Sequence, residues 1–302
     1  MKITLTGATG YVGSKLVAAL KARGDEIAVL SRNGARAARS LGVEAADWDW
    51  TAGPAPADAL AGRDVVVHLA GAPVAQRWNA TAKQEILDSR ETGTRRLVDG
   101  LRDAEPRPAR LICASASAFY GPGGDEPVDE MSPAGRDWLA DVCVRWEREA
   151  DAAAAAELGM SVVKVRTGIT VDPTYGALAS MMLPFKLGLG GPLAGGRQYV
   201  PWIHPDDLIG LYLRAIDAPD FSGPINASAP SPVTNKQLSR ALGRVLHRPT
   251  IVPVPGIAAK LMVGEVAKYA ISGTRMVPGR AAELGYAFAY PEIDGALADV
   301  LA

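Results

Sequence analysis

The chain has 302 residues, of which 48% are hydrophobic and 22% are charged, and its formal net charge is -1. This composition predicts a globular protein with a full core and excludes a disordered or fibrous one. The basic residues are scattered along the chain, so we expect neither nucleic acid nor a membrane surface as a partner. We expect instead a small-molecule substrate and a monomeric or homodimeric protein.

The two cysteines, Cys113 and Cys143, lie in apolar stretches and are too few for a disulfide framework or a metal cluster. We expect both to be reduced, buried thiols, and we predict no metal site. A strand-like run follows Met1 directly, and no apolar segment reaches the roughly 18 residues that a membrane span requires. These features predict a cytoplasmic protein without a signal peptide.

Short apolar runs alternate with longer, alanine-rich segments of helical period through the first half of the chain. Strands are predicted at residues 2–5, 26–30, 64–69, 110–114 and 161–166, and helices at residues 14–22, 35–41, 81–101 and 137–158. Continuous apolar runs such as Val65-Val66-Val67 are typical of parallel strands that are buried on both faces. The pattern predicts an α/β protein with a doubly wound parallel sheet of the Rossmann type.

The alternation changes after Arg166, where glycine and proline become frequent. A helix at residues 205–217 and an extended segment at residues 224–227 are expected to return to the main sheet. We therefore predict a nucleotide-binding domain over residues 1–171, with return elements at about residues 199–229. Residues 172–198 and 230–302 are predicted to form a smaller C-terminal region on the substrate side.

A glycine-rich loop, G-A-T-G-Y-V-G at residues 7–13, stands between the first strand and the first helix. Glycines in such a loop allow a tight turn, close approach of the backbone to a pyrophosphate, and close packing of the helix on the strand. The helix N-terminus adds free N–H groups for the phosphates. We assign the dinucleotide to Thr6, Gly7, Gly10, Tyr11, Val12 and Gly13.

The second strand ends where an NAD enzyme carries an acidic residue for the ribose, about 20 residues past the glycine loop. This chain has Ser31 and Arg32 there, with Arg36 one turn further on. A guanidinium group can bind a 2′-phosphate through two hydrogen bonds, so the sequence favours NADP (NADPH) over NAD. The alternative is that Arg32 is an ordinary solvated loop arginine.

Motifs along nearly the whole chain resemble those of the extended short-chain dehydrogenases/reductases, which include nucleotide-sugar epimerases. The chain is most similar to an atypical branch, the epimerase family with a C-terminal domain of unknown function, sometimes labelled cell-division inhibitor. The matching motifs include T-G at residues 6–7, H-L-A-G at 68–71, S-R at 89–90, S-A-S-A at 115–118, R-T-G at 166–168, W-I-H at 202–204 and L-G-Y at 284–286.

The resemblance implies an NADP-type cofactor that lies along the carboxyl ends of the strands. It implies contacts from Leu69, Ala70 and Gly71 on the adenosine-ribose side and from Ser115 near the nicotinamide. Asp47 either approaches the adenine or caps a turn. We assign Arg90 to the cofactor as well, although it could also bind an anionic substrate together with Arg166, Arg197 and Gln198, or form a salt bridge on its helix.

The wider superfamily uses a tyrosine and, four residues later, a lysine on the helix that follows Ser115. The positions that align with this pair are Leu139 and Cys143, so the usual acid–base residues are missing. The one Tyr-x-x-x-Lys match, Tyr11 to Lys15, belongs to the glycine loop and cannot serve this purpose. The family's ordinary dehydrogenase chemistry is therefore in doubt for this chain.

Another acid or base would have to replace the missing pair, and our candidates are Tyr120, Ser115 and His204, with Ser117 also considered. A phenol has a pKa near 10 and requires a cationic neighbour to act as a base at neutral pH, whereas an imidazole has a pKa near 6.5. Each candidate has a structural alternative. For Tyr120 the alternative is a structural tyrosine at the end of a strand, and for His204 it is capping of the helix that Pro205 begins.

The glycine-rich segment between Phe185 and Gln198 is too broken for a core helix and suits a loop that covers a ligand. We predict a substrate cleft lined by Ser117, Met181, Pro184, Phe185, Gln198 and Trp202, together with Tyr120 and His204. Alternatively, the apolar members of this set form a dimer contact or a closed core.

Two functions fit these observations. The first is an NADP-dependent oxidoreductase or epimerase that acts on a small polar or nucleotide-linked substrate. The second is a non-catalytic NADP(H)-binding sensor or regulatory protein that acts on a protein partner. The sequence favours the enzyme.

Overall fold

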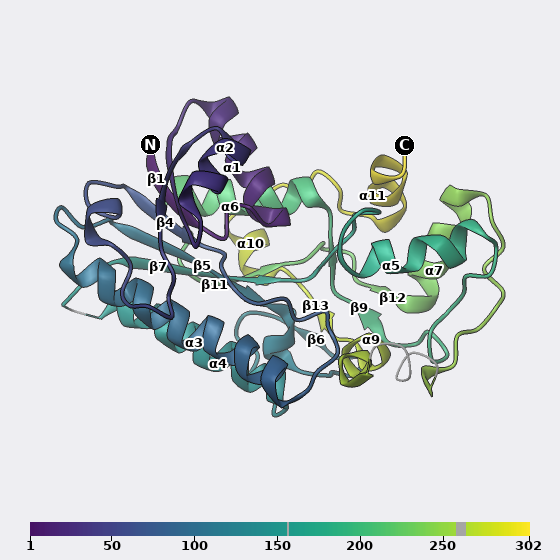
Figure 1. Cartoon of the computed structure of the whole chain (residues 1–302). Coiled ribbons are helices and arrows are strands. Elements are labelled where there is room, and N and C mark those ends of the chain that lie inside the picture. Colours follow the sequence, from purple (N-terminus) through teal and green to yellow (C-terminus); the bar gives the residue numbers. More distant parts are fainter. Residues whose placement is uncertain (156, 258–263) are drawn as a thin grey trace.

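A seven-stranded parallel sheet forms the centre of the larger part of the molecule (Figure 1). The computed structural model describes residues 1–155, 157–257 and 264–302. Strand order across the sheet is β11-β7-β5-β4-β1-β2-β3. The strands are β1 (Lys2–Thr6), β2 (Glu26–Ser31), β3 (Glu44–Asp47), β4 (Val65–His68), β5 (Arg110–Ala116), β7 (Ser161–Thr167) and β11 (Gly223–Ala227).

The strand order reverses between β1 and β4, which makes the sheet doubly wound. From β1 the chain proceeds through β2 to β3 at one edge, and then returns to β4 on the other side of β1. In register, Ile3 lies beside Ile27 on β2 and beside Val65 on β4. The predicted fold class is therefore confirmed, and the reversal creates a crevice at the carboxyl ends of the strands, where ligands of such sheets bind.

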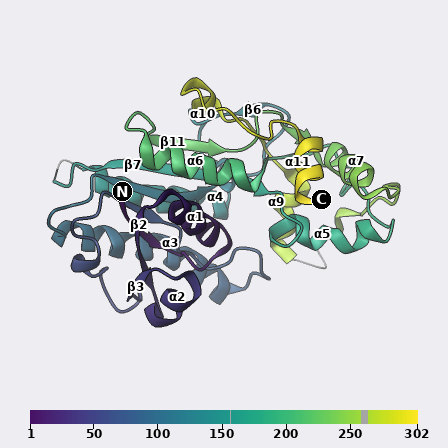
Figure 2. The same ribbon diagram turned by 90° about the horizontal axis from the view of Figure 1, so that it is seen from above.

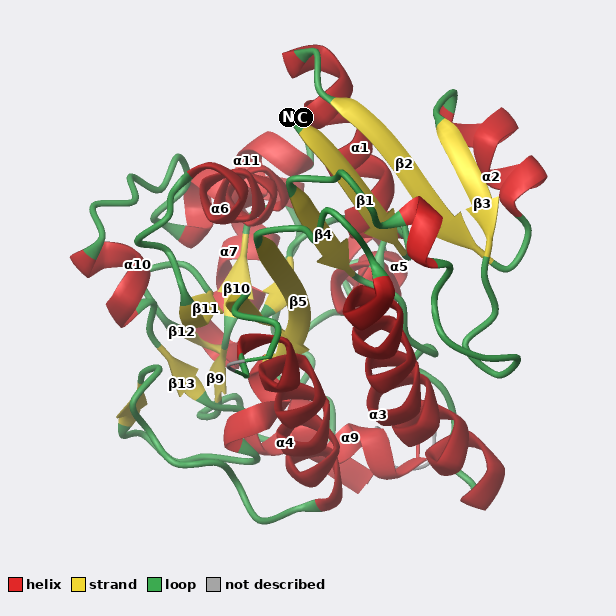
Figure 3. Ribbon diagram, turned by 90° about the vertical axis from the view of Figure 1, so that its left-hand side faces the viewer, coloured by secondary structure: helices red, strands yellow, loops and turns green. Residues whose placement is uncertain are grey.

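Helices cover both faces of this sheet (Figure 3). On one face lie α1 (Tyr11–Arg23) and α6 (Pro205–Asp217), whose apolar side chains pack with β1 and β7 in one core. On the other face lie α3 (Ala80–Asp103) and α4 (Trp138–Asp151), which pack on β4 and β5 in a second core. The short α2 (Gly34–Leu41) follows β2. Burial on both faces explains the continuous apolar runs of the strands.

Helix α4 ends earlier than predicted. The sequence suggested one helix over residues 137–158, but α4 stops at Asp151 and is followed by the 3-10 turn η3 (Ala152–Ala154). Gly159 takes the left-handed conformation, and the Met160 amide donates to the Ala153 carbonyl. The chain has to reverse here to enter β7 at Ser161, and this requirement overrides the helix propensity of alanine. Residue 156 lies outside the described residues.

A smaller region packs beside the carboxyl end of the sheet (Figure 2). Its core joins side chains of α5 (Gly176–Lys186), α7 (Asn235–Leu246) and α11 (Ile293–Val300) with those of short strands. These strands are β8 (Ile169–Thr170), β9 (Tyr199–Val200), β10 (Trp202–Ile203) and β12 (Val233–Thr234), and the helices α9 (Ala267–Ser272) and α10 (Gly279–Glu283) follow. No helix in the described ranges is long and apolar enough to cross a membrane.

The smaller region is also attached to the loop that follows β5. Strand β13 (Arg275–Met276) pairs in parallel with β6 (Pro127–Val128), and the Gly123 amide donates to the Gly273 carbonyl. The Thr274 hydroxyl donates to the Gly121 carbonyl at 2.6 Å. This connection places α9 against the N-terminal end of α4.

Candidate functional site

The glycine loop between β1 and α1 passes directly under the segment that follows β4. Gly7 has φ of +68°, and a Cβ atom there would lie 2.6 Å from the carbonyl carbon of Leu69. A Cβ at Gly13 would lie 2.5 Å from the Gly7 oxygen, whereas a Cβ at Gly10 would meet only that same oxygen, at 3.2 Å. The fold therefore requires glycine at positions 7 and 13. Position 10 faces the open space in which a pyrophosphate would lie.

Polar groups at the ends of β1 and β4 hold this edge together. The Ala70 amide donates to the Thr6 hydroxyl oxygen at 3.2 Å, and the same oxygen lies 2.6 Å from His68 Nδ1. The first-turn N–H groups of α1, which begins at Tyr11, have no partner within the helix. These contacts bring the predicted cofactor residues Thr6, Gly7 and Ala70 together at one place, beside a helix N-terminus suited to phosphates.

The side chains of Tyr11 and Lys15 make contacts around the glycine loop and do not suit an acid–base role. The Tyr11 ring stacks on Tyr175 with a centroid separation of 4.0 Å, and its hydroxyl donates to Asp172. Burial and this carboxylate raise the pKa of Tyr11. Lys15 lies 5.1 Å above the Tyr11 ring. The pair links the glycine loop to the smaller region, as expected for a match fixed by its position in the loop.

The end of β2 presents an exposed guanidinium group. Arg32 and Arg36 are exposed, and neither guanidinium forms a hydrogen bond or ion pair among the residues that the structure describes. Hydrogen bonds lower the pKa of the Asp49 carboxyl, and the charge of Arg32 contributes to this shift. The Gly34 amide, at the start of α2, donates to Asp47 Oδ1 at 2.6 Å. Of the two alternatives for Asp47, the structure therefore shows capping of α2. Arg32 remains available for an anion.

Arg90 is a largely buried cation. Its Nη1 donates to the carbonyl oxygens of Ala72 and Ile86, and its guanidinium lies 4.9 Å from the centre of the Trp146 ring. A Cβ on Gly71 would touch it at 3.3 Å. Within the described ranges no carboxylate forms an ion pair with Arg90, so the salt-bridge alternative is not observed. Burial lowers the pKa of this group.

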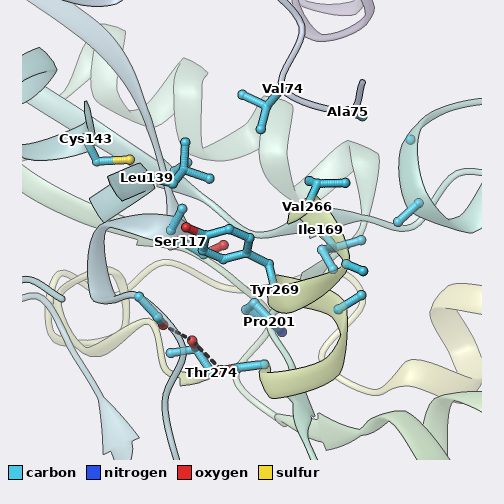
Figure 4. A pocket seen from close by; sticks show the side chains of 18 of the residues that line it. Val74, Ala75, Ser117, Leu139, Cys143, Ile169, Pro201, Val266, Tyr269 and Thr274 are labelled. Carbon is cyan, nitrogen blue, oxygen red and sulfur yellow. Dashed lines mark hydrogen bonds between the residues drawn. The ribbon is translucent and has the colours of Figure 1, made fainter. Parts of the chain in front are cut away.

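A cavity of about 670 Å³ lies at the carboxyl ends of β5 and β7, between the sheet and the smaller region (Figure 4). It is mostly apolar. Its lining comes from the loop after β4, from α3, η2 (Ser117–Tyr120), α4, α5 and α9. The lining residues include Arg90, Ser117, Leu139, Cys143, Pro201 and Tyr269. A cavity of this size suits a small molecule.

The two positions of the missing tyrosine and lysine, Leu139 and Cys143, both line this cavity. Both side chains are buried on α4. Burial raises the pKa of the Cys143 thiol to about 12, so the group is uncharged at neutral pH and is a poor nucleophile. These residues form an apolar wall where the wider superfamily has its acid–base pair.

Ser115 and Tyr120 belong to a buried polar network rather than to the cavity wall. Ser115 donates to Glu147 at 2.7 Å, and Glu147 forms an ion pair with Arg166 at 2.8 Å. Arg166 donates to the Tyr120 hydroxyl, which in turn donates to Asn226 at 2.6 Å. Burial raises the pKa of Tyr120 to about 12 despite the neighbouring guanidinium. Ser117, two residues past Ser115, is the serine that lines the cavity.

His204 caps α6. Its Nδ1 accepts a hydrogen bond from the Asp206 amide, and its Nε2 lies 3.2 Å from Asp299. The ring is buried, stacks on Tyr290 with centroids 3.6 Å apart, and is not among the residues that line the cavity. Both ring nitrogens are occupied, so the structure shows the capping alternative.

Of the eight predicted cleft residues, Ser117 lines the cavity, and five more lie elsewhere in addition to Tyr120 and His204. Phe185 and Trp202 are buried in the core of the smaller region, against which Met181 packs, and Pro184 is exposed. Gln198 donates to the carbonyl oxygens of Leu193 and Ala270. The wall is instead built by chain neighbours of these residues, which are Gly176, Ala177, Ser180 and Pro201. Which of these neighbours faces the cavity depends on how α5 and the chain around residue 201 are oriented, and the sequence alone did not reveal that orientation.

Tyr269 is one of the polar lining residues that sequence reasoning missed. It lies on α9, and its ring extends into the cavity toward Ser117 and Leu139 (Figure 4). Its hydroxyl donates to Asp137, the N-cap residue of α4. No motif indicated this residue, because its segment is distant in sequence from every other part of the site.

These features define a class of protein. A doubly wound parallel sheet, a glycine loop that opens a helix, and a cavity at the switch-point edge belong to a dinucleotide-binding protein of the Rossmann type. Residues 3–227 match the NAD dependent epimerase/dehydratase family, and residues 254–300 match a domain of unknown function, DUF1731. The chain belongs to this epimerase/dehydratase family, which confirms the family predicted from its motifs.

Relatives with this arrangement match the chain over its full length. Epimerase family protein SDR39U1 homolog, chloroplastic, of Arabidopsis thaliana is 37% identical over 100% of this chain and 87% of its own. Human epimerase family protein SDR39U1 is 33% identical over all of both chains. A crystal structure of the human protein (isoform 2) with NADPH has a TM-score of 0.87 at 31% identity and covers 99% of each chain.

Proposed function

We propose that the protein is an NADP(H)-dependent oxidoreductase or epimerase that acts on a small polar or nucleotide-linked substrate. The observation that carries this proposal is the cavity at the carboxyl ends of β5 and β7. Its mostly apolar lining includes a partly buried cation, Arg90, and a hydroxyl, Ser117. A non-reactive cofactor-binding protein would have no need of such a space beside the cofactor edge.

The residues of the chain fit a nicotinamide dinucleotide. The open space at Gly10 and the N-terminus of α1 would hold the pyrophosphate, and Ala70 and Gly71 would lie against the ribose. Arg32, exposed and without a hydrogen bond or ion pair within the described residues, would hold a 2′-phosphate. The NADPH in the crystal structure of the human relative supports the choice of NADP. When bound, this group would accept or donate the hydride.

The second candidate is a sensor that binds NADP(H) and acts on a protein partner. It is favoured by one observation, which is that the apolar Leu139 and the uncharged Cys143 occupy the positions of the family's acid–base pair. Turnover separates the two functions. An oxidoreductase should oxidise NADPH with at least one member of a panel of aldehydes, ketones and α-dicarbonyls. An epimerase returns the hydride within each turnover, so it should interconvert nucleotide-sugar epimers without net oxidation of NADPH. A sensor should bind NADPH and do neither.

The NADP assignment is tested by titrating NADPH and NADH against the protein and following tryptophan fluorescence. NADPH should bind more tightly, and Arg32→Ala should reduce that preference about 10-fold or more, since a hydrogen-bonded charge pair contributes about 1.5–3 kcal/mol. Arg39→Ala is the matched control, because Arg39 is an exposed arginine in the last turn of α2. Equal affinity for NADH, or an unchanged preference in Arg32→Ala, would contradict the assignment.

A further inference from the structure

The cavity lacks a phenol at the usual place on α4 but contains one from a different element. Tyr269 comes from α9, and its ring packs with Leu139 and with Trp78, whose ring centroid is 6.0 Å away. Its hydroxyl reaches the N-terminal end of α4, where it faces Asp137 and the Leu139 amide. The phenol therefore lies beside the position that the missing tyrosine would occupy.

Asp137 is placed to accept a proton from the Tyr269 hydroxyl. Its Oδ1 accepts hydrogen bonds from the Leu139 and Ala140 amides and from the Tyr269 hydroxyl. Its Oδ2 is buried and, in the described part of the chain, has no hydrogen-bond partner. Lys268 Nζ lies 4.0 Å from Oδ2, and its side chain is 51% exposed. One end of the carboxylate thus faces the phenol, and the other lies near a side chain that reaches solvent.

The surroundings fix the position of Tyr269. Gln198 donates to the Ala270 carbonyl at 3.0 Å, and the Gly273 amide donates to the Tyr269 carbonyl at 3.0 Å. A Cβ at Gly273, where φ is +58°, would lie 2.0 Å from the Tyr199 oxygen. This tight packing immediately after α9 holds the phenol in a defined place, as an acid–base group requires.

We propose that Tyr269 and Asp137 form the proton relay of this site and replace the missing Tyr-x-x-x-Lys pair. The inference rests on the proposed function. When a substrate alcohol is oxidised, its hydroxyl proton passes to Tyr269 Oη while the phenol proton moves to Asp137 Oδ1, so no phenolate is formed. The two electrons leave the carbinol carbon as a hydride to the oxidised nicotinamide. After the product leaves, Asp137 Oδ1 returns its proton to Tyr269 Oη while the phenol proton passes to water that enters the cavity, and carbonyl reduction follows the reverse course.

Three variants test the relay. Tyr269→Phe keeps the ring and removes the hydroxyl, and Asp137→Asn keeps a helix-capping oxygen but cannot take up the proton. Tyr290→Phe is the matched control, because the Tyr290 hydroxyl also donates to an aspartate, Asp299, at 2.8 Å, but lies outside the cavity lining. Each variant is assayed with NADPH and whichever carbonyl the wild type reduces, and with NADP+ and the corresponding alcohol. NADPH affinity and melting temperature are measured in parallel.

Loss of a general acid–base group typically lowers turnover about 100-fold or more, and we expect this for Tyr269→Phe and Asp137→Asn with NADPH affinity within about twofold of wild type. Tyr290→Phe should retain wild-type turnover. If Tyr269→Phe retains turnover and loses only melting temperature, the contact is a structural latch and the relay is wrong. If the wild type neither reduces a carbonyl of the panel nor interconverts nucleotide-sugar epimers, the proposed function itself fails.

A readout without turnover uses protein labelled at the ζ-carbon of tyrosine. The Tyr269 NMR signal, assigned by its loss in Tyr269→Phe, should remain that of a neutral phenol up to pH 10. It should shift in Asp137→Asn, because the carboxylate acceptor is gone. If the chemical shift of Tyr269 is the same in Asp137→Asn as in the wild type, the phenol and the carboxylate share no proton, and the relay is overturned.

Discussion

At the scale of single residues, the three glycines of the loop after β1 have different reasons to be glycine. Gly7 has a positive φ, and a Cβ atom there would lie 2.6 Å from the Leu69 carbonyl carbon. A Cβ atom at Gly13 would lie 2.5 Å from the Gly7 oxygen. Gly10 has φ of -76°, which any residue adopts, and its Cβ position has one neighbour within 4 Å. The protein alone explains Gly7 and Gly13, whereas the proposed pyrophosphate site would explain Gly10.

This difference predicts opposite behaviour for two substitutions. Gly10→Val should keep the fold, with a melting temperature within a few degrees of wild type, and should abolish measurable NADPH binding because its side chain fills the pyrophosphate space. Gly7→Ala should lower the melting temperature markedly through backbone strain and overlap with the Leu69 backbone. Thermal unfolding and fluorescence titration of both variants test this. Normal NADPH affinity in a folded Gly10→Val protein would contradict the cofactor placement.

The residue scale also shows where sequence reasoning stops. It placed Thr6, Gly7 and Ala70 at one edge, because the carboxyl ends of parallel strands meet there. It assigned Ser115 to the cofactor and to catalysis, and Ser117 to the substrate cleft. In the structure Ser115 turns toward Glu147 and Ser117 faces the cavity, and these orientations depend on strand register and on the position of α4.

At the scale of elements, α4 is joined to β7 by a buried ion pair. Glu147 and Arg166 approach at 2.8 Å through two pairs of atoms, and their side chains are 6% and 5% exposed. Ser115 on β5 donates to the same carboxylate. One carboxylate thus connects a helix to two neighbouring strands of the sheet below the cavity.

Removing that charge should be costly. Glu147→Gln leaves Arg166 buried without a counter-ion, and breaking such a pair typically destabilises a protein by about 3–5 kcal/mol. Asp294→Asn is the control, because Asp294 pairs with Arg244 at a site where both side chains are 59% exposed, and exposed pairs contribute at most about 1 kcal/mol. Urea unfolding measures both. A loss in Glu147→Gln no larger than in the control would mean that the surroundings relax around the unpaired guanidinium.

Individual elements such as α4 were predictable from local patterns, whereas the contact between α9 and α4 was not. Periodicity indicated α4 and its apolar face, so Leu139 and Cys143 could be assigned to the helix that borders the site. Tyr269 reaches the same place from α9, more than a hundred residues later, through contacts of residues 273 and 274 with residues 199 and 121. Such long-range packing leaves no local pattern in the sequence.

At the scale of the whole molecule, most of the sheet was predictable because its inner strands are buried on both faces and read as apolar runs. The edge strand β3 has no buried residue and was not predicted. His68 is one of several buried polar residues in this core. His68, at the end of β4, is fully buried, with Nδ1 2.6 Å from the Thr6 hydroxyl and Nε2 3.1 Å from the Thr94 hydroxyl. Burial, together with the nearby Arg90 guanidinium, lowers the pKa of His68 to about 4.

The stability of the whole molecule should therefore depend on pH through His68. Between pH 6.5 and about pH 4 the unfolded chain takes up a proton at an ordinary histidine, with a pKa near 6.5, whereas the folded protein does not. Stability from this group is complete above pH 6.5 and declines as the pH falls. By pH 5 the loss amounts to about 2 kcal/mol.

Urea unfolding of the wild type and of His68→Asn at pH 7 and pH 5 measures this loss. Asparagine retains hydrogen-bonding groups for the two threonines but does not titrate, so His68→Asn should lose less stability than the wild type between these pH values, by about 2 kcal/mol. His247→Asn is the control, since His247 is exposed and has φ of +52°, a conformation that asparagine adopts readily. That variant should keep the wild-type pH dependence. Equal losses in His68→Asn and the wild type would mean that His68 is already protonated in the folded protein at pH 5.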